Sequence, residues 1–223
     1  MIKDIYLLVG GEATRLRPLS EGIPKALLTI KGKLLIDLIL ENLVKSNLEN
    51  INLICSIKHE KFWLEYKKNS QFNVNLHFEN EKLDTAGFVV QNINNFSDKF
   101  LCMNGDLLIE TNFDSFLEVA NNSKNSTICS IPVDDPSRYG VLELDGTKII
   151  NFIEKPEDMK YGNNISLGVY CLHKKDIKEI ESKLEIPSSF EKNVFPELAD
   201  NNLLDCFIVE GVMLDVGTRE SYI

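Results

Sequence analysis

Residues 5–19 read IYLLVGGEATRLRPL, and a Pro-Lys pair follows at residues 24–25. The apolar run at residues 2–9 predicts a buried strand, and the two glycines predict a tight loop at its carboxyl end. In an open α/β sheet, ligands bind beyond the carboxyl ends of the strands. The glycines let backbone N–H groups approach a phosphate, while Thr14 adds a hydroxyl and Arg15 a positive charge. The spacing fits neither a P-loop nor a dinucleotide-binding fingerprint.

Outward from this loop, short apolar runs alternate with helical patterns. Strands are expected at residues 50–57, 74–78, 100–103 and 127–133, and helices at residues 34–44, 59–67, 85–93 and 113–120. This βαβ alternation predicts a Rossmann-like, mostly parallel sheet with helices on both faces.

The pattern changes after residue 136. Residues 140–144 and 148–153 predict a hairpin with Asp145-Gly146 in its turn. Further strands are expected at residues 166–172, 203–209 and 212–216, and helices at residues 174–182 and 189–199. The fold class is therefore α/β, with an antiparallel insertion in the second half of a single domain at residues 1–223.

The composition excludes several classes of protein. The chain has 24 Lys and Arg residues and 34 Asp and Glu residues, which gives a net charge of −10. This negative charge argues against nucleic acid or an anionic membrane as a partner. No apolar run approaches the ~20 residues of a membrane span, and the start lacks the pattern of a signal peptide. Five widely spaced cysteines predict reduced core residues of a cytoplasmic protein: Cys55, Cys102, Cys129, Cys171 and Cys206.

Two carboxylates follow apolar strands at distant points of the chain. Asp106 comes after the strand at residues 100–103, and Asp215 follows an apolar run that starts at residue 212. Carboxylates at strand ends can meet over one Mg²⁺, a hard ion that prefers carboxylate and phosphate oxygens. The sequence therefore predicts Mg²⁺ as the cofactor.

The opening string G-G-x-x-T-R-L-R-P-L followed by P-K closely resembles the signature of the sugar-1-phosphate nucleotidylyltransferases. Later segments match that family in order: LDTAG at 83–87, NGD at 104–106, YGV at 139–141, FIEKP at 152–156, GVY at 168–170 and LDVGT at 214–218. The resemblance covers nearly the whole chain. It implies the nucleotide-diphospho-sugar transferase fold, with residues 1–135 as the nucleotide-binding half and residues 136–223 as the sugar-phosphate-binding half.

The resemblance also implies a role for individual residues. It assigns catalysis to Arg15 and Lys25, and the metal to Asp106 and Asp215. The residues expected to bind the nucleotide are Leu8, Gly10, Gly11, Thr14, Glu79, Asp84 and Gly105. Those expected to bind the sugar phosphate are Gly140, Glu154, Lys155 and Ser166.

The chain departs from the family's pattern at four positions. Ala13 and Asp84 stand where glycine is usual, Ser166 where asparagine is common, and Met213 where tryptophan is common. A residue other than glycine is strained wherever the backbone needs a positive φ. The sequence stops at Ile223, so no C-terminal β-helix is expected.

The implied reaction transfers a nucleotidyl group from a nucleoside triphosphate to a sugar 1-phosphate, giving a nucleotide-diphosphate sugar and pyrophosphate. GTP with mannose or heptose 1-phosphate is the first expectation, because the Glu79 carboxylate can accept both the N1–H and N2–H donors of guanine. Three alternatives stay open: a uridylyl- or thymidylyltransferase, a phosphocholine-type cytidylyltransferase, and a non-catalytic nucleotide-sensing homologue. The expected partners are the two substrates and further copies of the chain in a homo-oligomer.

Overall fold

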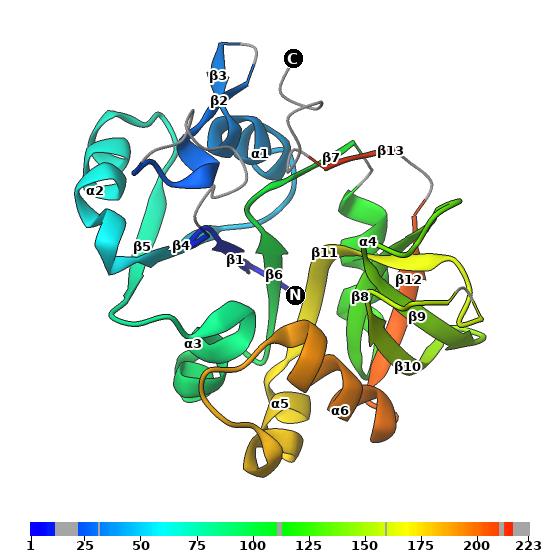
Figure 1. Ribbon diagram of the computed structural model, residues 1–223. Coiled ribbons are helices and arrows are strands. Elements are labelled where there is room, and N and C mark those ends of the chain that lie inside the picture. Colours follow the sequence, from blue (N-terminus) through cyan, green and yellow to red (C-terminus); the bar gives the residue numbers. More distant parts are fainter. Residues whose placement is uncertain (12–21, 31, 111–112, 159, 210–211, 216–223) are drawn as a thin grey trace. The chain divides into compact units, whose positions relative to one another are not determined.

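The computed structural model describes residues 1–11, 22–30, 32–110, 113–158, 160–209 and 212–215, with only the backbone described at 109–110 and 212–215. The chain divides into two compact units, whose elements are labelled in Figure 1. The larger unit comprises Met1–Ile2, Leu83–Cys102 and Asp114–Gly211, and the smaller unit comprises Lys3–Lys82, Met103–Phe113 and Val212–Ile223.

The smaller unit contains three parallel strands in the order β5–β4–β1. Their bounds are β1 Asp4–Leu8, β4 Asn50–Ser56 and β5 Val74–Glu79. Helix α1 (Leu35–Leu43) lies between β1 and β4 in the chain, and helix α2 (Glu60–Asn69) lies between β4 and β5. Five apolar residues of α1 repeat at helical spacing and are buried, which confirms the helix predicted at residues 34–44: Leu35, Ile36, Ile39, Leu40 and Leu43.

Two small antiparallel pairs complete this unit. One joins β2 (Thr29–Ile30) to β3 (Lys33–Leu34), and the other joins β7 (Leu107–Glu110) to β13 (Val212–Asp215). Short 3-10 helices lie at η2 (Lys25–Leu27) and η3 (Ile57–His59). The strand predicted near residue 212 is confirmed, but the sequence did not predict its partner β7.

The larger unit contains six strands in the order β6–β11–β8–β12–β10–β9. Their bounds are β6 Lys99–Asn104, which ends in the smaller unit, β8 Ser126–Pro132, β9 Gly140–Asp145, β10 Lys148–Glu154, β11 Asn164–His173 and β12 Leu204–Ile208. Strand β8 pairs parallel with β12 and antiparallel with β11. The predicted β9–β10 hairpin is confirmed, with Gly146 at a φ of 61° in its turn.

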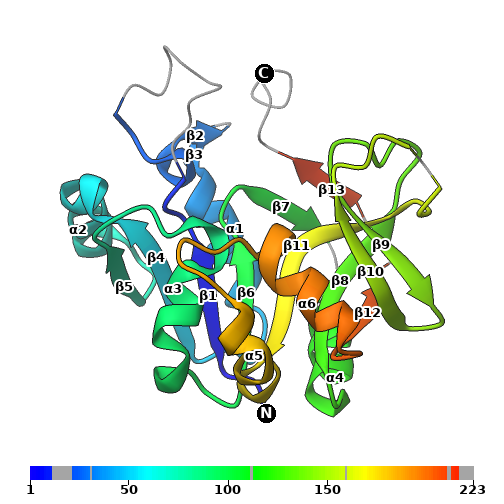
Figure 2. The same cartoon turned by 60° about the horizontal axis from the view of Figure 1, so that its bottom comes forward.

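Helices cover both faces of the larger unit's strands (Figure 2). Their bounds are α3 Asp84–Asn92, α4 Phe113–Asn122, α5 Lys174–Ile180 and α6 Phe195–Asp200, with 3-10 turns at η4 Ile93–Asn95 and η5 Glu181–Lys183. Phe116 of α4 packs on Phe207 of β12. Phe195 of α6 packs on Phe152 of β10 and Tyr170 of β11. These two side chains point to the face of the strands opposite that of Phe207, since neighbouring side chains along a strand point to opposite faces.

The helix predicted at residues 189–199 begins as a π-helix, η6 (Phe190–Val194), and continues as α6. Pro196 occupies the first turn of α6. Proline has no N–H to donate, and its ring crowds the carbonyl four residues earlier. The wider π turn before Pro196 therefore has a local cause in the sequence.

The core cysteines agree with the sequence analysis. All five are free and buried, and burial raises the pKa of the Cys129 and Cys171 thiols to about 12 and that of Cys206 to about 11. In the described part of the chain, the structure contains no helix with the length and apolar character that a membrane crossing requires.

Candidate active site

An ion pair joins two of the residues predicted to act on the triphosphate and the metal. The Lys25 Nζ lies 2.6 Å from Oδ2 of Asp106, with the two side chains 18% and 41% exposed. Lys25 begins η2, and its N–H donates to the carbonyl of Gly11 at 3.4 Å. The Pro-Lys motif, the glycine loop and Asp106 therefore meet within the smaller unit.

Gly105 explains how Asp106 comes so close to the end of β1. Its N–H donates to the Leu8 carbonyl at 3.1 Å. A Cβ on Gly105 would lie 2.5 Å from Cγ1 of Val9 and 2.8 Å from the Leu8 oxygen, which are distances that side chains do not tolerate. Only glycine allows this approach, so the NGD motif has a steric reason that is independent of any ligand.

Glu79 ends β5 on the same side of the smaller unit. It pairs in register with Ser56 of β4, and its Oε2 lies 3.2 Å from where a Cβ on Gly10 would be. Burial raises the pKa of the Cys55 thiol, and the Glu79 carboxylate raises it further. Among the described residues, a Cβ on Gly11 would meet no atom within 4 Å. Leu8, Gly10, Gly11 and Glu79 thus lie together at the ends of β1 and β5.

The second predicted metal ligand approaches the first along the backbone. Asp215 pairs with Leu107 in the β13–β7 ladder, so it lies opposite the residue that follows Asp106. Its carboxylate is outside the described side chains, as are Ala13, Thr14 and Arg15 of the opening loop and the side chain of Met213. No cluster of three or more His, Cys, Asp or Glu residues suited to a metal occurs in the described part of the chain.

The residues predicted to hold the sugar phosphate gather in the larger unit. Gly140 and Glu154 pair in register across β9 and β10, and Glu154 Oε2 lies 3.2 Å from the Cβ position of Gly140. The Lys155 Nζ lies 2.9 Å from Glu154 Oε1. Glu154 is 20% exposed and Lys155 59% exposed, so the ammonium is accessible while the carboxylate is partly buried.

The backbone fixes the direction of this pair. Lys155 has a φ of 51°, and its N–H donates to the Tyr139 carbonyl at 3.0 Å. Ser166 lies at an irregularity in β11, where its Oγ accepts from the N–H of Gly168 at 3.3 Å. Gly168 has a φ of 67°, which glycine adopts without strain. The GVY motif therefore marks a bulge beside Ser166.

Asp84, which stands where glycine is usual in the family, has a left-handed backbone conformation. It has a φ of 64°, in the left-handed region, and begins α3 in the larger unit. The Asp84 Oδ1 accepts from the N–H of Thr85 at 2.9 Å, a local bond that makes this conformation more accessible to aspartate than to most residues. Sequence reasoning named Thr85 only as part of a motif and missed Glu191, which bonds to it at 2.7 Å.

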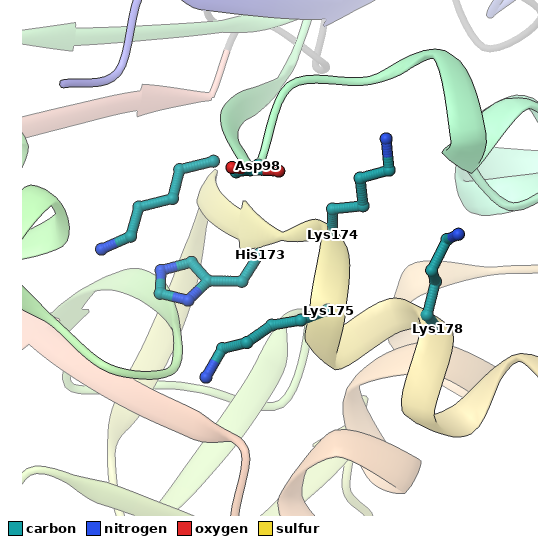
Figure 3. Close-up of a pocket in the computed structure, with 6 residues that line it drawn as sticks. Asp98, His173, Lys174, Lys175 and Lys178 are labelled. Carbon is teal, nitrogen blue, oxygen red and sulfur yellow. The ribbon is translucent and has the colours of Figure 1, made fainter.

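A separate cavity of about 460 Å³ in the larger unit is lined by lysines (Figure 3). The Lys99 ammonium donates to the carbonyls of three residues at the end of α4, and Lys174 donates to the carbonyls of Asn94 and Phe96. None of the predicted site residues that the structure describes lines this cavity. These two lysines stabilise loop backbone, and we do not include them in the site.

Parallel strands that end in glycine loops, with charged side chains at those ends, are typical of α/β proteins that bind phosphorylated ligands. The chain belongs to the nucleotidyl transferase family, because the model of that family matches residues 5–223. The predicted family and α/β fold are thus confirmed.

Similar proteins include the mannose-1-phosphate guanyltransferase of Hypocrea jecorina, 33% identical over 97% of this chain and 61% of its own length. The catalytic subunit beta of the Drosophila melanogaster mannose-1-phosphate guanylyltransferase is also 33% identical, over 97% of this chain and 60% of its own. The chain thus spans about 60% of the length of these curated relatives. A crystal structure of HddC from Yersinia pseudotuberculosis complexed with GMP-PN superposes with a TM-score of 0.80, at 30% identity, over 99% of this chain and 96% of that one.

Proposed function

We propose that this chain transfers a nucleotidyl group from GTP to mannose or heptose 1-phosphate, forming a nucleotide-diphosphate sugar and releasing pyrophosphate. The observation that carries the proposal is the Lys25–Asp106 pair beside Gly105, at the ends of strands that belong to a nucleotidyl transferase chain. The guanylyl preference rests on the names of the similar guanyltransferases and on the GMP-PN complex of HddC.

The reaction joins two anions on a protein whose net charge is −10. A phosphate oxygen of the sugar attacks the α-phosphorus, and the bond from that phosphorus to the bridging oxygen breaks as pyrophosphate leaves. The sugar phosphate is already ionised at neutral pH, so the chain needs no covalent nucleophile or strong base. Positioning and neutralisation of charge supply most of the catalysis, and we assign these to Arg15 and Lys25.

Asp106 and Asp215 would hold Mg²⁺, because two carboxylates on adjoining backbone suit a hard cation. Oδ2 of Asp106 faces Lys25, and the side chain is 41% exposed, so the carboxylate is accessible to a metal. Mg²⁺, when bound, supplies positive charge between the two reactants. Leu8, Gly10, Gly11, Thr14 and Gly105 would place the triphosphate and nucleoside against backbone.

Lys155 and Glu154 would receive the sugar phosphate. The exposed ammonium of Lys155 suits the phosphate, and the partly buried carboxylate of Glu154 suits a sugar hydroxyl. Phe152 and Glu154 leave no room for a Cβ on Gly140, so its backbone lies close to the Glu154 carboxylate. Ser166 offers a hydroxyl from the irregularity in β11. We assign residues 1–135 to the nucleotide-binding half and residues 136–223 to the sugar-phosphate-binding half, with Asp215 serving the metal.

Glu79 and Asp84 would contribute to recognition of the base. A carboxylate accepts two hydrogen bonds from guanine, whereas uracil and thymine offer one donor flanked by carbonyl oxygens. A buried carboxylate without its donors costs roughly 1–3 kcal/mol. Guanine should therefore be favoured about tenfold or more over uracil and thymine.

Pyrophosphate release tests the proposal. The purified chain is assayed with Mg²⁺ and GTP, UTP, CTP, dTTP or ATP against mannose, heptose and glucose 1-phosphates and phosphocholine. We expect GTP with mannose or heptose 1-phosphate to give the highest kcat/KM, and Glu79→Gln to narrow the preference for GTP. A wild-type preference for UTP or dTTP would contradict the guanylyl assignment, and no release with any pair would contradict the activity.

The setting of the reaction follows from the same features. Five free, buried cysteines fit a reducing compartment, and we place the protein in the cytoplasm. We also propose a homo-oligomer, which light scattering coupled to size-exclusion chromatography would test.

A further inference from the structure

A carboxylate in η6 anchors the start of α3. Oε2 of Glu191 accepts two hydrogen bonds of 2.7 Å, one from the hydroxyl of Thr85 and one from the hydroxyl of Ser189. The Thr85 oxygen in turn accepts from the N–H of Phe190 at 2.9 Å. Thr85 lies more than 100 residues before Ser189 and Glu191 in the sequence, yet the three side chains form one continuous network in the larger unit.

The backbone of the two segments is joined as well. The N–H of Ala86 donates to the Ser188 carbonyl at 2.8 Å, and the N–H of Ser188 donates to the Leu83 carbonyl at 2.9 Å. The N–H of Thr85 donates a hydrogen bond to Asp84 Oδ1. The N–H groups of Thr85 and Ala86 at the start of α3 are therefore bound within the protein, which fixes the backbone of this helix start.

The fixed helix start contains a strained residue. Asp84 has a φ of 64°, a left-handed conformation that persists only where the surroundings hold it. The neighbouring Thr85 is fixed through its hydroxyl by Glu191 and Phe190. The Thr85 N–H donates to Asp84 Oδ1, so Asp84 is held to the residue that Glu191 fixes.

We propose that Glu191 is a positioning residue for nucleotide binding. Its carboxylate holds the Thr85 hydroxyl and thereby keeps Asp84 in the left-handed conformation in which it meets the nucleotide. The inference rests on the proposed function for the placement of the nucleotide at Asp84. It adds a residue outside the motifs of the nucleotide and sugar-phosphate sites.

The kinetic test uses two substitutions of Glu191. Glu191→Ala removes the acceptor of both hydroxyls, and we expect the KM for GTP to rise ~10-fold, as for the loss of a hydrogen bond to a charged group. The KM for the sugar phosphate should change less than about twofold, since the groups that we assign to it, Lys155 and Glu154, pair with each other and not with Glu191. Glu191→Gln keeps an amide oxygen that can accept from Thr85, so it should restore most of the GTP affinity and also guards against failure of the alanine variant to fold.

A double-mutant cycle with Thr85 checks the route of the effect. Thr85→Val should raise the KM for GTP as Glu191→Ala does, Thr85→Ser should rescue it, and the double variant should be no worse than either single variant. Glu197→Ala is the matched control, because this carboxylate lies in α6 and pairs with Lys183 at 2.7 Å, away from α3. Its kinetics should equal those of the wild type.

Two results separate this inference from the proposed function. An active enzyme whose Glu191→Ala variant binds GTP normally, or loses affinity equally for both substrates, would overturn the role of Glu191 alone. If no pair of substrates reacts, calorimetry with GTP alone still compares Glu191→Ala with the wild type, and a tenfold loss of affinity would support the role. A chain that binds no nucleotide at all overturns both.

Discussion

Asp106 is the residue on which the proposed chemistry depends most directly. Asp106→Asn keeps the size of the side chain but removes the charge that would hold Mg²⁺ and that now pairs with Lys25. We expect turnover to fall at least ~100-fold, about 3 kcal/mol of transition-state stabilisation, with the circular dichroism spectrum unchanged. Asp215→Asn should behave alike. Asp158→Asn, which alters an exposed partner of Lys160, should keep full activity and serves as the control.

Near wild-type rates in both variants, with an unchanged dependence on Mg²⁺ concentration, would remove the metal assignment. The Asp106 substitution has little structural reason to unfold the chain, because asparagine keeps the size of a side chain that is 41% exposed.

Lys155 should affect one substrate and not the other. Lys155→Met removes the exposed ammonium while keeping the length of the side chain, so the KM for the sugar 1-phosphate should rise ~10-fold or more and the affinity for GTP should stay within about twofold. Calorimetry with each ligand separately measures this. Lys160→Met is the matched control, since Lys160 is equally exposed and pairs only with Asp158 among the carboxylates of the described structure. Equal losses for both ligands would place Lys155 outside the sugar-phosphate site.

At the scale of elements, the contact between the ends of β1 and β6 depends on Gly105. Gly105→Ala would force a Cβ to within 2.8 Å of the Leu8 oxygen, so the segment that carries Asp106 must shift. We expect a loss of about 1–3 kcal/mol in the free energy of unfolding, together with a fall in kcat at temperatures where the variant is fully folded.

Gly146→Ala provides the comparison for this prediction. Gly146 also resists substitution, through its φ of 61°, but it lies in open space at the β9–β10 turn. The Gly146→Ala variant should lose roughly 1 kcal/mol in the free energy of unfolding and keep the kcat of the wild type. Equal effects of the two substitutions on kcat would show that the β1–β6 contact does not position Asp106.

Most elements were predictable because their signals are local. The apolar residues of α1 repeat at helical spacing, and the β9–β10 hairpin carries an Asp-Gly turn between alternating strands. Strand β7 was missed because it has only four residues and its partner β13 lies about 100 residues later in the chain. Such a short strand is fixed by its partner and not by its own sequence.

Part of the candidate site was predictable because its residues also stand in local sequence patterns. The strand-end position of Asp106 follows from the apolar run before it, and the structure places Lys25 against it. The network of Glu191 with Thr85 could not be predicted, since only the folded chain brings residues so far apart in sequence into contact. The positive φ of Asp84 was also hidden, because aspartate adopts it only under local constraint.

At the scale of the whole molecule, stability should depend on pH through a buried histidine. His173 is 2% exposed, and burial, aided by Lys99 and Lys175, lowers its pKa to about 4, whereas unfolded histidine titrates near 6.5. The unfolded chain therefore binds more protons between these values, so stability falls as the pH drops from about 6.5 to about 4. The loss from this group reaches about 3 kcal/mol.

Asp176 acts in the opposite sense. Burial raises its pKa above 3.8, so the folded state holds its proton more tightly and its contribution becomes more favourable as the pH falls. Urea denaturation at several pH values, on wild type and His173→Gln, isolates the histidine. The variant should lose less stability between pH 6.5 and pH 4, and parallel curves would contradict the assignment to His173.

The buried thiols give the molecule a built-in reporter of local opening. A buried cysteine reacts with a thiol reagent only when its surroundings open, so the labelling rate measures the free energy of that opening. Cys55 belongs to the smaller unit, while Cys102, Cys129, Cys171 and Cys206 belong to the larger one. Mapping of the labelled peptides after brief exposure to the reagent would thus measure local opening in each unit separately, without any introduced probe. A nucleotide that slows the labelling of Cys55 and a sugar phosphate that slows the labelling of Cys171 would show which part of the chain each ligand stiffens.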